Sequence, residues 1–539
     1  MIMTKYEVLK KYFSEKEGFR DVQEEVIDSL LEGNSTLCLM PTGGGKSLIY
    51  QVAGICTKKT TIIISPLVAL MNQQSQEMME KGISTISFSG MDYKQQFKII
   101  TDMASGKMPQ YMFISPERSS CDGYLEYVLS KQKNNIGLIV IDEAHCISQW
   151  GDGFRPAYKN IPLFLDRIFG DSNWPVVLCL TATLNGQQQQ QIIEDFNITK
   201  TIKGENLWRK NLQLEIFNLK NGKEDTKDEQ LEKIIEKHKG EKILVFAHRV
   251  YGKHPTTRTL YDKYKDVYEG VAYFDSKADD KYKVQVLKSF QNGDIKIVFA
   301  TSAFGMGVDI PDVRVVVNYL ISETVEQYYQ EVGRGGRDGE QAYGYLLYTN
   351  QSKRGRRMLL NQSLCTEKSL IDLYEDRRPR GEMSFGHISY EDMNEDQKVA
   401  YALLQEYKIY SVVAKGLSSI RCLEAISAEG QSFIDALKQY ARNGSTSVIT
   451  KKSGKNINSL ILSIWEMCAN GHIKMIKAPD RSIFYVQNKE LDDDLKDKIL
   501  NDQETKKNLR ISKFEEFVSS IEAGDTAEVL IKRELDIGE

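Results

Sequence analysis

Residues 40–47 read Met-Pro-Thr-Gly-Gly-Gly-Lys-Ser and lie between a short apolar run and a helical pattern. Glycines let the backbone turn so that its N–H groups surround phosphate oxygens, and a following helix adds its positive end. Lys46 can reach the β- and γ-phosphates of a nucleotide, and the Ser47 hydroxyl can ligate Mg²⁺. The stretch predicts a phosphate-binding loop made of Thr42, Gly43, Gly44, Gly45, Lys46 and Ser47. The alternative is a glycine-rich turn that precedes a lysine by chance.

Apolar runs of strand length alternate with amphipathic stretches on both sides of this loop. The runs lie at 36–40, 61–65, 111–115, 138–141 and 176–180, and again at 243–246, 297–300, 313–319 and 342–348. This alternation is typical of parallel sheets covered by helices, because each crossover between parallel strands needs a long connection. We therefore expect an α/β fold with two such domains in series, at residues 1–210 and 211–350.

Composition narrows the class of protein. The 539 residues include 71 Lys and Arg against 75 Asp and Glu, a net charge of −4, which excludes a wholly cationic binder but not a local basic groove. No apolar window is long enough to span a membrane, and residues 1–11 lack the apolar core of a secretory signal. The eight cysteines form no C-x-x-C pair, which favours scattered thiols in a reducing compartment. We expect a cytoplasmic protein without membrane contact, nucleoid-associated if bacterial.

A second stretch complements the loop. Residues 139–145 read Ile-Val-Ile-Asp-Glu-Ala-His, an apolar strand that ends in two carboxylates. Asp142 would hold Mg²⁺ through water, and Glu143 would polarise the attacking water. The alternative is an acidic pair that caps a helix at the end of a strand.

A third stretch offers positive charge. Residues 330–338 read Gln-Glu-Val-Gly-Arg-Gly-Gly-Arg-Asp and carry Arg334 and Arg337 on a glycine-rich loop. Phosphoryl transfer needs positive charge opposite the leaving group, and an arginine from a second domain can supply it. The alternative is a basic surface turn.

Together these stretches resemble the superfamily 2 helicases and, in detail, the RecQ-type DNA helicases. The resemblance runs in order from about residue 15 to 350 and includes 64–71, 114–118, 181–183, 208–212 and 300–309. Its most specific piece is 142–158 (DEAHCISQWGDGFRPAY), where the acidic box is fused to an aromatic-rich loop.

This resemblance implies two RecA-like motor domains with ATP and Mg²⁺ between them, moving 3′ to 5′ on single-stranded DNA. It implies catalytic roles for Lys46, Asp142, Glu143, Gln330, Arg334 and Arg337. Nucleotide contacts would come from the 42–47 loop, Arg20, Gln23, Gly307 and Asp309, with Ser47 and Asp142 as metal ligands. DNA binding and its coupling to hydrolysis would involve His145, Trp150, Phe154, Arg155, Thr181 and Thr183. For Trp150 and Phe154 the alternative is an ordinary core position.

Three departures distinguish this chain from the family pattern. The aromatic loop has Asp152 and Gly153 where the family usually has a His-Asp pair. Asp21 follows Arg20 where a proline is usual, and Lys16 stands near the position that stacks on adenine. After Tyr348 the cysteines are Cys365, Cys422 and Cys468, too few and too far apart for a four-cysteine zinc domain. We predict no zinc.

The rest of the chain divides into three predicted parts. Residues 351–390 form a basic connector suited to phosphate contact or to a seam between domains. Residues 391–490 are expected to hold a winged helix, because a helix at 456–470 precedes two strands, 472–476 and 483–486, that could form its hairpin. The alternative there is an unrelated α+β packing domain. Residues 491–539 are helical and charged, which suits a docking element or a surface for a protein partner.

The leading hypothesis is an ATP-dependent DNA helicase or translocase that acts on single-stranded and forked DNA. The alternative is an ATP-switched DNA-binding or scaffold subunit of a larger complex, in defence or repair, with little unwinding activity. A third hypothesis is an RNA helicase, which the RecQ-like loop disfavours.

Overall fold

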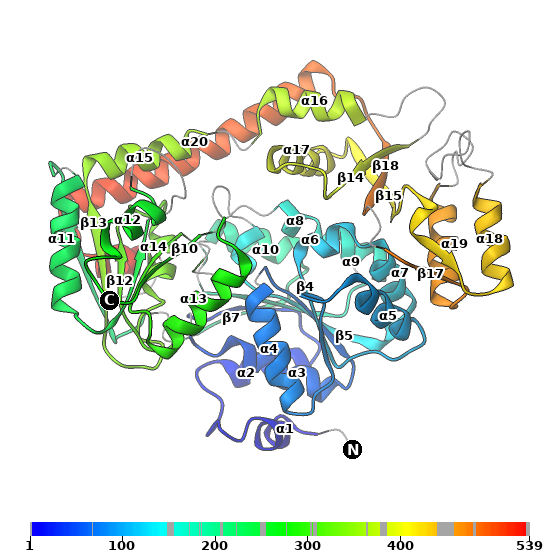
Figure 1. Cartoon of the computed structure of the whole chain (residues 1–539), viewed down its shortest axis with the longest axis horizontal. Coiled ribbons are helices and arrows are strands. Elements are labelled where there is room, and N and C mark those ends of the chain that lie inside the picture. The colour runs from blue at the N-terminus through cyan, green and yellow to red at the C-terminus, as the bar shows by residue number, and fades with distance from the viewer. Residues whose placement is uncertain are drawn as a thin grey trace.

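Two α/β lobes and a third, smaller module make up the computed structural model (Figure 1). The structure describes residues 3–534 except 42, 67, 148–155, 172, 183, 185, 205–207, 223, 248–254, 276, 302–303, 305–309, 363–364, 378–384, 439–456 and 478–480. Within this part of the chain, no helix is both long enough and apolar enough to cross a membrane.

The first domain is built on a seven-stranded sheet of order β3-β4-β2-β5-β6-β1-β7, in which every neighbouring pair is parallel. Its strands are β1 (Thr36–Leu39), β2 (Thr60–Ile64), β3 (Thr85–Ser87), β4 (Tyr111–Ile114), β5 (Ile136–Ile141), β6 (Val176–Thr181) and β7 (Lys200–Lys203). The central strands are mostly apolar and are buried along almost their whole length, because helices cover both of their faces.

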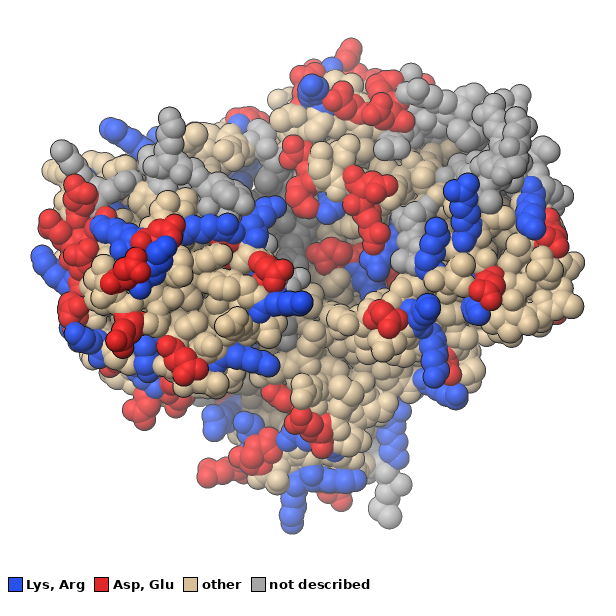
Figure 2. All heavy atoms as spheres, in the orientation of Figure 1, with Lys and Arg blue, Asp and Glu red and all other residues tan. Residues whose placement is uncertain are grey.

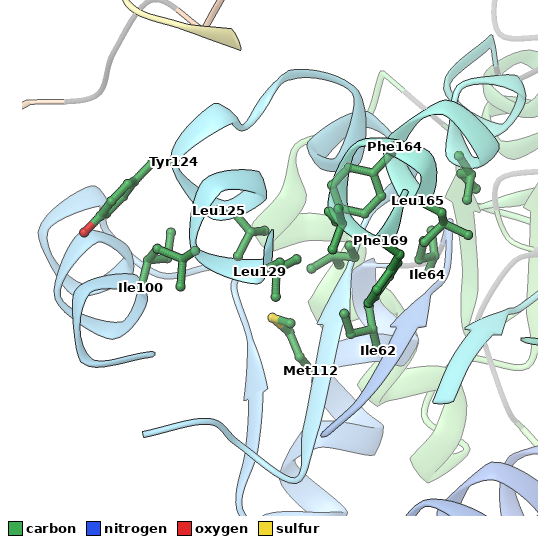
Figure 3. Close-up of a cluster of buried hydrophobic side chains, with 14 of the residues drawn as sticks. Ile62, Ile64, Ile100, Met112, Tyr124, Leu125, Leu129, Phe164, Leu165 and Phe169 are labelled. Carbon is green, nitrogen blue, oxygen red and sulfur yellow. The ribbon is translucent and has the colours of Figure 1, made fainter. Parts of the chain in front are cut away.

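One face of this sheet packs against α1 (Lys5–Tyr12), α2 (Gln23–Leu31), α3 (Lys46–Thr57) and α4 (Val68–Glu80). The other face packs against α5 (Tyr93–Ala104), α7 (Gly123–Lys131), α9 (Ile161–Phe169) and α10 (Gly186–Asp195). The short helices α6 (Pro116–Cys121) and α8 (Pro156–Lys159) lie between them in the chain. Figure 3 shows the second face, where Ile62 and Met112 of the sheet meet Leu125, Leu129 and Phe169 of the helices.

The second domain repeats this plan with a six-stranded parallel sheet of order β10-β11-β9-β12-β13-β8. Its strands are β8 (Leu212–Asn218), β9 (Lys242–Phe246), β10 (Val271–Phe274), β11 (Ile297–Ala300), β12 (Val313–Asn318) and β13 (Ala342–Tyr348). Its helices are α11 (Glu224–Lys237), α12 (Thr257–Tyr264), α13 (Asp280–Asn292) and α14 (Val325–Val332). The predicted fold class, two parallel-sheet domains in series, is confirmed.

A small α+β module follows, which we call the C-terminal module. It contains the antiparallel sheet β14-β18-β15 and the ribbon β16-β17. The strands are β14 (Gly386–Ser389), β15 (Tyr410–Gly416), β16 (Leu423–Ala425), β17 (Ile473–Met475) and β18 (Ser482–Gln487). The helices are α16 (Glu367–Arg377), α17 (Glu395–Glu406), α18 (Ala428–Lys438) and α19 (Ile457–Ala469).

This topology corrects one prediction. The hairpin expected between 472–476 and 483–486 is wrong, because β17 pairs with β16 whereas β18 lies between β14 and β15. The first four residues of β18 are all buried, and a strand buried on both faces belongs in the interior of a sheet. By contrast, β17 exposes Lys474 between two buried residues, as a ribbon strand with one solvated face does.

The C-terminal module is fastened to the first domain. Lys415 of β15 is 3% exposed, and its ammonium group contacts the Glu126 carboxylate at 2.7 Å and the Ser119 carbonyl oxygen at 2.7 Å. Burial, reinforced by the positive charge of Arg167, lowers the pKa of Lys415 to about 8. The carbonyl oxygen of Lys415 would lie 1.8 Å from a Cβ on Gly123, so only glycine permits this approach.

The chain then returns to the second domain. Helix α15 (Asn350–Leu360) leads out of that domain, and α20 (Asp493–Ala523) with α21 (Ala527–Glu534) comes back to it; α20 crosses the top of the view in Figure 1. Apolar residues of α20 and α21 belong to the same core as β8, β12 and α14; they are Phe514, Phe517, Val518, Ile521, Ala527, Leu530 and Ile531. The apolar face of this tail is therefore covered by the chain itself, as a docking element would be, and the surface for a protein partner stays a prediction.

The basic cluster of the predicted connector lies at the same seam. Lys353 and Arg357 of α15 each contact Glu515 of α20 at 3.0 Å. Arg356 is 1% exposed and donates to the carbonyl oxygen of Ile321 at 2.9 Å. Of the two roles considered for these residues, the seam is the one that their contacts support.

Candidate nucleotide site

The glycine-rich loop joins β1 to α3 at the carboxyl edge of the first sheet. It begins where the Met40 amide donates to the carbonyl oxygen of Thr181 at 3.0 Å, and α3 starts at Lys46. Gly43 and Gly45 have φ angles of 81° and 77°, which side-chain-bearing residues rarely adopt. The helix N-terminus therefore faces the loop and supplies unpaired N–H groups and positive potential.

Gln23 braces this loop from outside. Its amide nitrogen donates to the carbonyl oxygens of Gly44 and Gly45 at 3.1 and 3.0 Å, and its amide oxygen accepts from the Arg20 backbone N–H at 2.8 Å. A Cβ on Gly45 would lie 2.6 Å from that amide nitrogen. The residue predicted to contact adenine thus also fixes the phosphate loop.

The Ser47 hydroxyl is held by a residue that the sequence analysis missed. Gln74 of α4 donates to Ser47 Oγ at 2.8 Å and accepts from the Tyr50 hydroxyl at 2.6 Å. Gln74 lies three positions beyond the 64–71 stretch that resembled a family motif, so extending that stretch is the signal that could have found it.

Asp142 and Glu143 follow β5 directly. Ser65 donates to the Asp142 carboxylate at 3.1 Å, and the Glu143 backbone N–H donates to the same carboxylate at 3.0 Å. Burial and the neighbouring Glu143 charge raise the pKa of Asp142 to about 6. Burial also favours the neutral form of Glu143, yet the positive charges of Lys46 and His145, with both arginines, hold its pKa below the usual value.

His145 connects this acidic pair to the end of β6. Its Nδ1 lies 3.3 Å from the Glu143 carboxylate and 3.2 Å from the Thr181 hydroxyl. Burial lowers the pKa of His145. His145 and Thr181 were both predicted to couple DNA binding to hydrolysis. They are in contact with each other, and His145 also contacts Glu143.

The second domain reaches the same site through the loop after α14. Arg334 and Arg337 line a cavity of about 360 Å³ together with the phosphate loop. A Cβ placed on Gly43 would lie 3.4 Å from Arg337 Cγ, so the arginine side chain lies against the loop. The two domains thus form one site.

Residues between β7 and β8 hold this arginine loop. Arg209 donates to the carbonyl oxygens of Gly333, at 2.9 Å, and Gly336. Asn211 donates to the Gly336 carbonyl oxygen at 2.8 Å and to that of Glu340 at 2.7 Å. The 208–212 stretch was visible only as part of the resemblance, because the carbonyl groups that Arg209 and Asn211 contact lie more than 120 residues later.

Most of the predicted site residues in the described part of the chain line the cavity. They are Arg20, Gln23, Gly43, Gly44, Gly45, Lys46, Ser47, Asp142, Glu143, Arg334 and Arg337, and Lys16 joins them. Gln330, His145 and Thr181 do not line it. The predictions for Thr42, Trp150, Phe154, Arg155, Thr183, Gly307 and Asp309 lie outside the described residues.

The cavity suits a nucleoside triphosphate with Mg²⁺. Its volume falls within the range of small-molecule sites, and its phosphate end combines a glycine cradle with Lys46 and two arginines. Ser47 and Asp142 offer the oxygen ligands that Mg²⁺ prefers. Elsewhere, no three His, Cys, Asp or Glu residues among those described gather as a metal site, and Cys365, Cys422 and Cys468 are buried thiols. The absence of zinc stays a prediction.

Comparison with known families gives two matches along the chain. Residues 20–192 match the DEAD/DEAH box helicase family, and residues 226–339 match the helicase conserved C-terminal domain. The two matches fall on the first and second parallel-sheet domains.

Curated relatives match across both domains. The ATP-dependent DNA helicase RecQ of Bacillus subtilis is 33% identical over 374 residues, covering 69% of this chain and 60% of the relative. RecQ of Haemophilus influenzae is 32% identical over 350 residues, covering 64% and 53%. The helicase SGS1 of Saccharomyces cerevisiae is 33% identical over 335 residues, covering 60% and 22%. The chain thus spans less than two thirds of the length of these relatives.

Solved structures agree on the fold. The helicase MrfA bound to DNA has a TM-score of 0.52 at 16% identity, covering 76% of this chain and 61% of its own. A DEAD-box helicase bound to single-stranded RNA has a TM-score of 0.52 at 17% identity, covering 68% and 75%. Likeness at this identity concerns the fold alone. With both helicase domains matched and RecQ enzymes among its relatives, the chain belongs to the RecQ-type superfamily 2 helicases.

Proposed function

We propose that this protein is an ATP-dependent DNA helicase that moves 3′ to 5′ along single-stranded DNA and parts duplexes at forks. The observation that carries the proposal is the composite cavity, where the phosphate loop and Asp142–Glu143 of one domain face Arg334 and Arg337 of the other. A site divided between two domains changes shape when they separate, so nucleotide turnover can drive movement.

The chemistry follows from the charges around the cavity. Lys46 and the loop N–H groups bind the phosphates, and Mg²⁺ held by Ser47 and Asp142 would neutralise charge on the phosphate oxygens. Glu143, kept ionised by its cationic neighbours, orients the attacking water and accepts its proton. Arg334 and Arg337 offset the charge that develops on the transferred phosphoryl group. Once the phosphate leaves, the arginines lose the negative charge that draws them toward the loop, and the cleft opens.

The 142–158 stretch and the DNA helicases among the relatives support DNA as the substrate. Trp150, Phe154 and Arg155 are proposed to sense the strand, with His145 and Thr181 linking them to Glu143. Basic and acidic side chains are interspersed over the face shown in Figure 2, which suits a motor that must release its track in each cycle. The eight buried free thiols support a reducing, cytoplasmic location.

The test measures ATP turnover with single-stranded DNA, forked DNA, duplex and RNA side by side, together with strand separation on the fork. We expect stimulation by single-stranded and forked DNA above that by RNA, and loss of turnover in Lys46→Ala. Turnover that ignores DNA, or DNA-stimulated turnover without translocation or unwinding, would contradict the proposal.

A further inference from the structure

Helix α14 carries the arginine loop at its C-terminal end, so its position, together with Arg209 and Asn211, sets where both arginines lie. Its apolar side packs into a core that α20 and α21 complete. The rings of Tyr328 on α14 and Phe517 on α20 lie 6.3 Å apart between centroids, and Val332 and Leu530 belong to the same cluster. The C-terminal helices α20 and α21 therefore pack along one side of α14.

A partly buried ion pair fixes the residues that lead into α14 to α20. Arg510 binds Glu323 through one edge of its guanidinium group, with Nε at 2.7 Å and Nη2 at 3.0 Å from the two carboxylate oxygens. The side chains are 16% and 12% exposed. A bidentate pair of this kind is directional as well as attractive, and water screens it little at this exposure.

Hydrogen bonds continue from this pair along α14. The Glu323 backbone N–H donates to the Gln327 side chain at 2.9 Å, and Gln327 donates to the Glu331 carboxylate at 2.9 Å. The Glu331 carbonyl oxygen accepts from the Arg334 backbone N–H at 3.1 Å. A connected row of polar contacts thus runs from Arg510 to the first arginine of the cavity.

The other half of α20 is tied to the first domain. Lys506, one turn before Arg510, contacts Glu406 of α17 at 3.5 Å, and the same carboxylate contacts Lys159 of α8 at 3.3 Å. Ile499 is buried in the core of the C-terminal module. Helix α20 therefore spans the distance between the lobe that holds the phosphate loop and the helix that carries the arginines.

We propose that Arg510 is a positioning residue for ATP hydrolysis: through Glu323 and α14, it holds Arg334 and Arg337 at the distance from the phosphate loop that the reaction requires. The inference rests on the proposed function. It assigns a role in the motor to a segment that begins more than 140 residues after β13, beyond both helicase-family matches. A shift of about 1 Å in a catalytic group can cost about 100-fold in rate, so loss of one anchor should be visible.

The test compares Arg510→Ala with Arg533→Ala in the full chain. Arg533 is a matched control because it also lies in the C-terminal helices, is 60% exposed and pairs with Asp525 rather than with α14. We expect kcat for DNA-stimulated ATP hydrolysis to fall about tenfold in Arg510→Ala, with KM for ATP within about twofold of the unchanged chain. Arg533→Ala should change neither. A kcat within twofold in Arg510→Ala would overturn the proposal.

A charge swap separates positioning from general damage to the fold. Arg510→Glu alone should lose at least as much kcat as Arg510→Ala, because two carboxylates would then face each other. Combining it with Glu323→Arg restores an ion pair of reversed polarity and should recover a large part of kcat. If the double variant is no better than Arg510→Glu alone, the pair does not act as a unit and the proposal fails.

Hydrogen exchange makes the result independent of the proposed function. In Arg510→Ala the amides of 323–337 should exchange faster than in the unchanged chain, while those of the phosphate loop and α3 stay the same. Unchanged exchange at 323–337 would overturn the positioning role even in an active enzyme. Faster exchange in a chain that hydrolyses no ATP would leave the anchor standing and reject the proposed function instead.

Discussion

The two motor domains contribute to the nucleotide site in different ways. The first domain supplies the loop and both carboxylates, and it holds them with its own side chains: Gln23 on the loop, Gln74 on Ser47, and Ser65 on Asp142. Among its described residues, the second domain supplies the arginines to the cavity. Strand β12 holds their loop in part, because the Gly336 N–H donates to the Val313 carbonyl oxygen at 2.8 Å and Arg314 pairs with Asp338, but other supports come from outside the sheet. These supports are Arg209 and Asn211, which precede the sheet, and Arg510 near the far end of the chain.

This difference separates the groups that bind the nucleotide and activate water from the arginines that stabilise the transition state. The half that binds the nucleotide is assembled locally, so damage elsewhere should leave affinity intact. The half that stabilises the transition state depends on long-range contacts, so distant changes should lower kcat without changing KM. The following predictions, from the largest effect to the smallest, test this division.

Glu143→Gln should give the largest effect. The amide keeps the shape of the side chain but cannot accept a proton from water, so we expect kcat to fall by at least about 1000-fold. Binding of a non-hydrolysable ATP analogue should stay within about twofold, because the loop is untouched. A loss of affinity as large as the loss of rate would show that Glu143 also contributes to nucleotide binding.

Arg337→Ala tests the second half of the site. An arginine supplied across a cleft is worth about 10³–10⁵ in phosphoryl transfer, and Arg334 would remain, so we expect kcat to fall about 100-fold. Affinity for the analogue should change far less. Arg354→Ala removes an exposed charge from α15 and serves as the control, with no change in kcat. Unaltered turnover in Arg337→Ala would show that this arginine does not act on the phosphate.

Gln23→Ala should affect binding more than rate. It removes two hydrogen bonds to the loop and the contact with Arg20, so KM for ATP should rise about tenfold. Gln73→Ala is the control, because that side chain is exposed and bonds Glu77 on the same helix. A fall in kcat with unchanged KM would place Gln23 in the catalytic half instead.

The smallest expected effect is a pH dependence of stability where α21 packs on α14. Burial and the carboxylate of Glu326 on α14 raise the pKa of Glu534 on α21 to about 7, with Lys513 and Glu516 also nearby. The folded protein therefore holds a proton that the unfolded chain releases above about pH 4.5. The stability from this proton is complete below pH 4.5 and is lost as the pH rises to about 7.

Because Glu534 is partly exposed, we expect this stability to be about 1 kcal/mol. Thermal unfolding from pH 4.5 to 7.5 checks the prediction: Tm of the unchanged chain should fall relative to Glu534→Gln as the pH rises. Glu528→Gln, at an exposed pair with Lys532, is the control. If Tm varied with pH in the same way in the unchanged chain and in Glu534→Gln, the prediction would be contradicted.

Local patterns predicted the first domain well. The glycine loop, the strand before Asp142 and the two parallel sheets are all visible in stretches of ten residues or fewer, because burial on both faces leaves continuous apolar runs. Arg334 and Arg337 could be assigned from the glycines around them. For these residues the sequence immediately around them carries the signal.

The rest depended on contacts between distant parts of the chain. Arg209 carries no local sign that it binds carbonyl groups near residue 335, and nothing around Arg510 indicates Glu323. The hairpin prediction failed for the same reason: β17 and β18 are neighbours in sequence, but each strand pairs with one much earlier in the chain. Strand pairing of this kind is decided by burial in the whole fold.

The covering of the second domain by α21 also has a consequence for how the protein is made. About 180 residues separate Tyr348, at the end of the last strand of that domain, from Ile531, which is fully buried in its core. At roughly 5–20 residues per second, a ribosome takes about 10–40 s to synthesise them. During that interval the nascent second domain has all its strands but exposes the apolar surface that α20 and α21 later cover. The newborn chain is then a natural client for chaperones until α20 and α21 have been synthesised as far as Ile531 and can cover this surface.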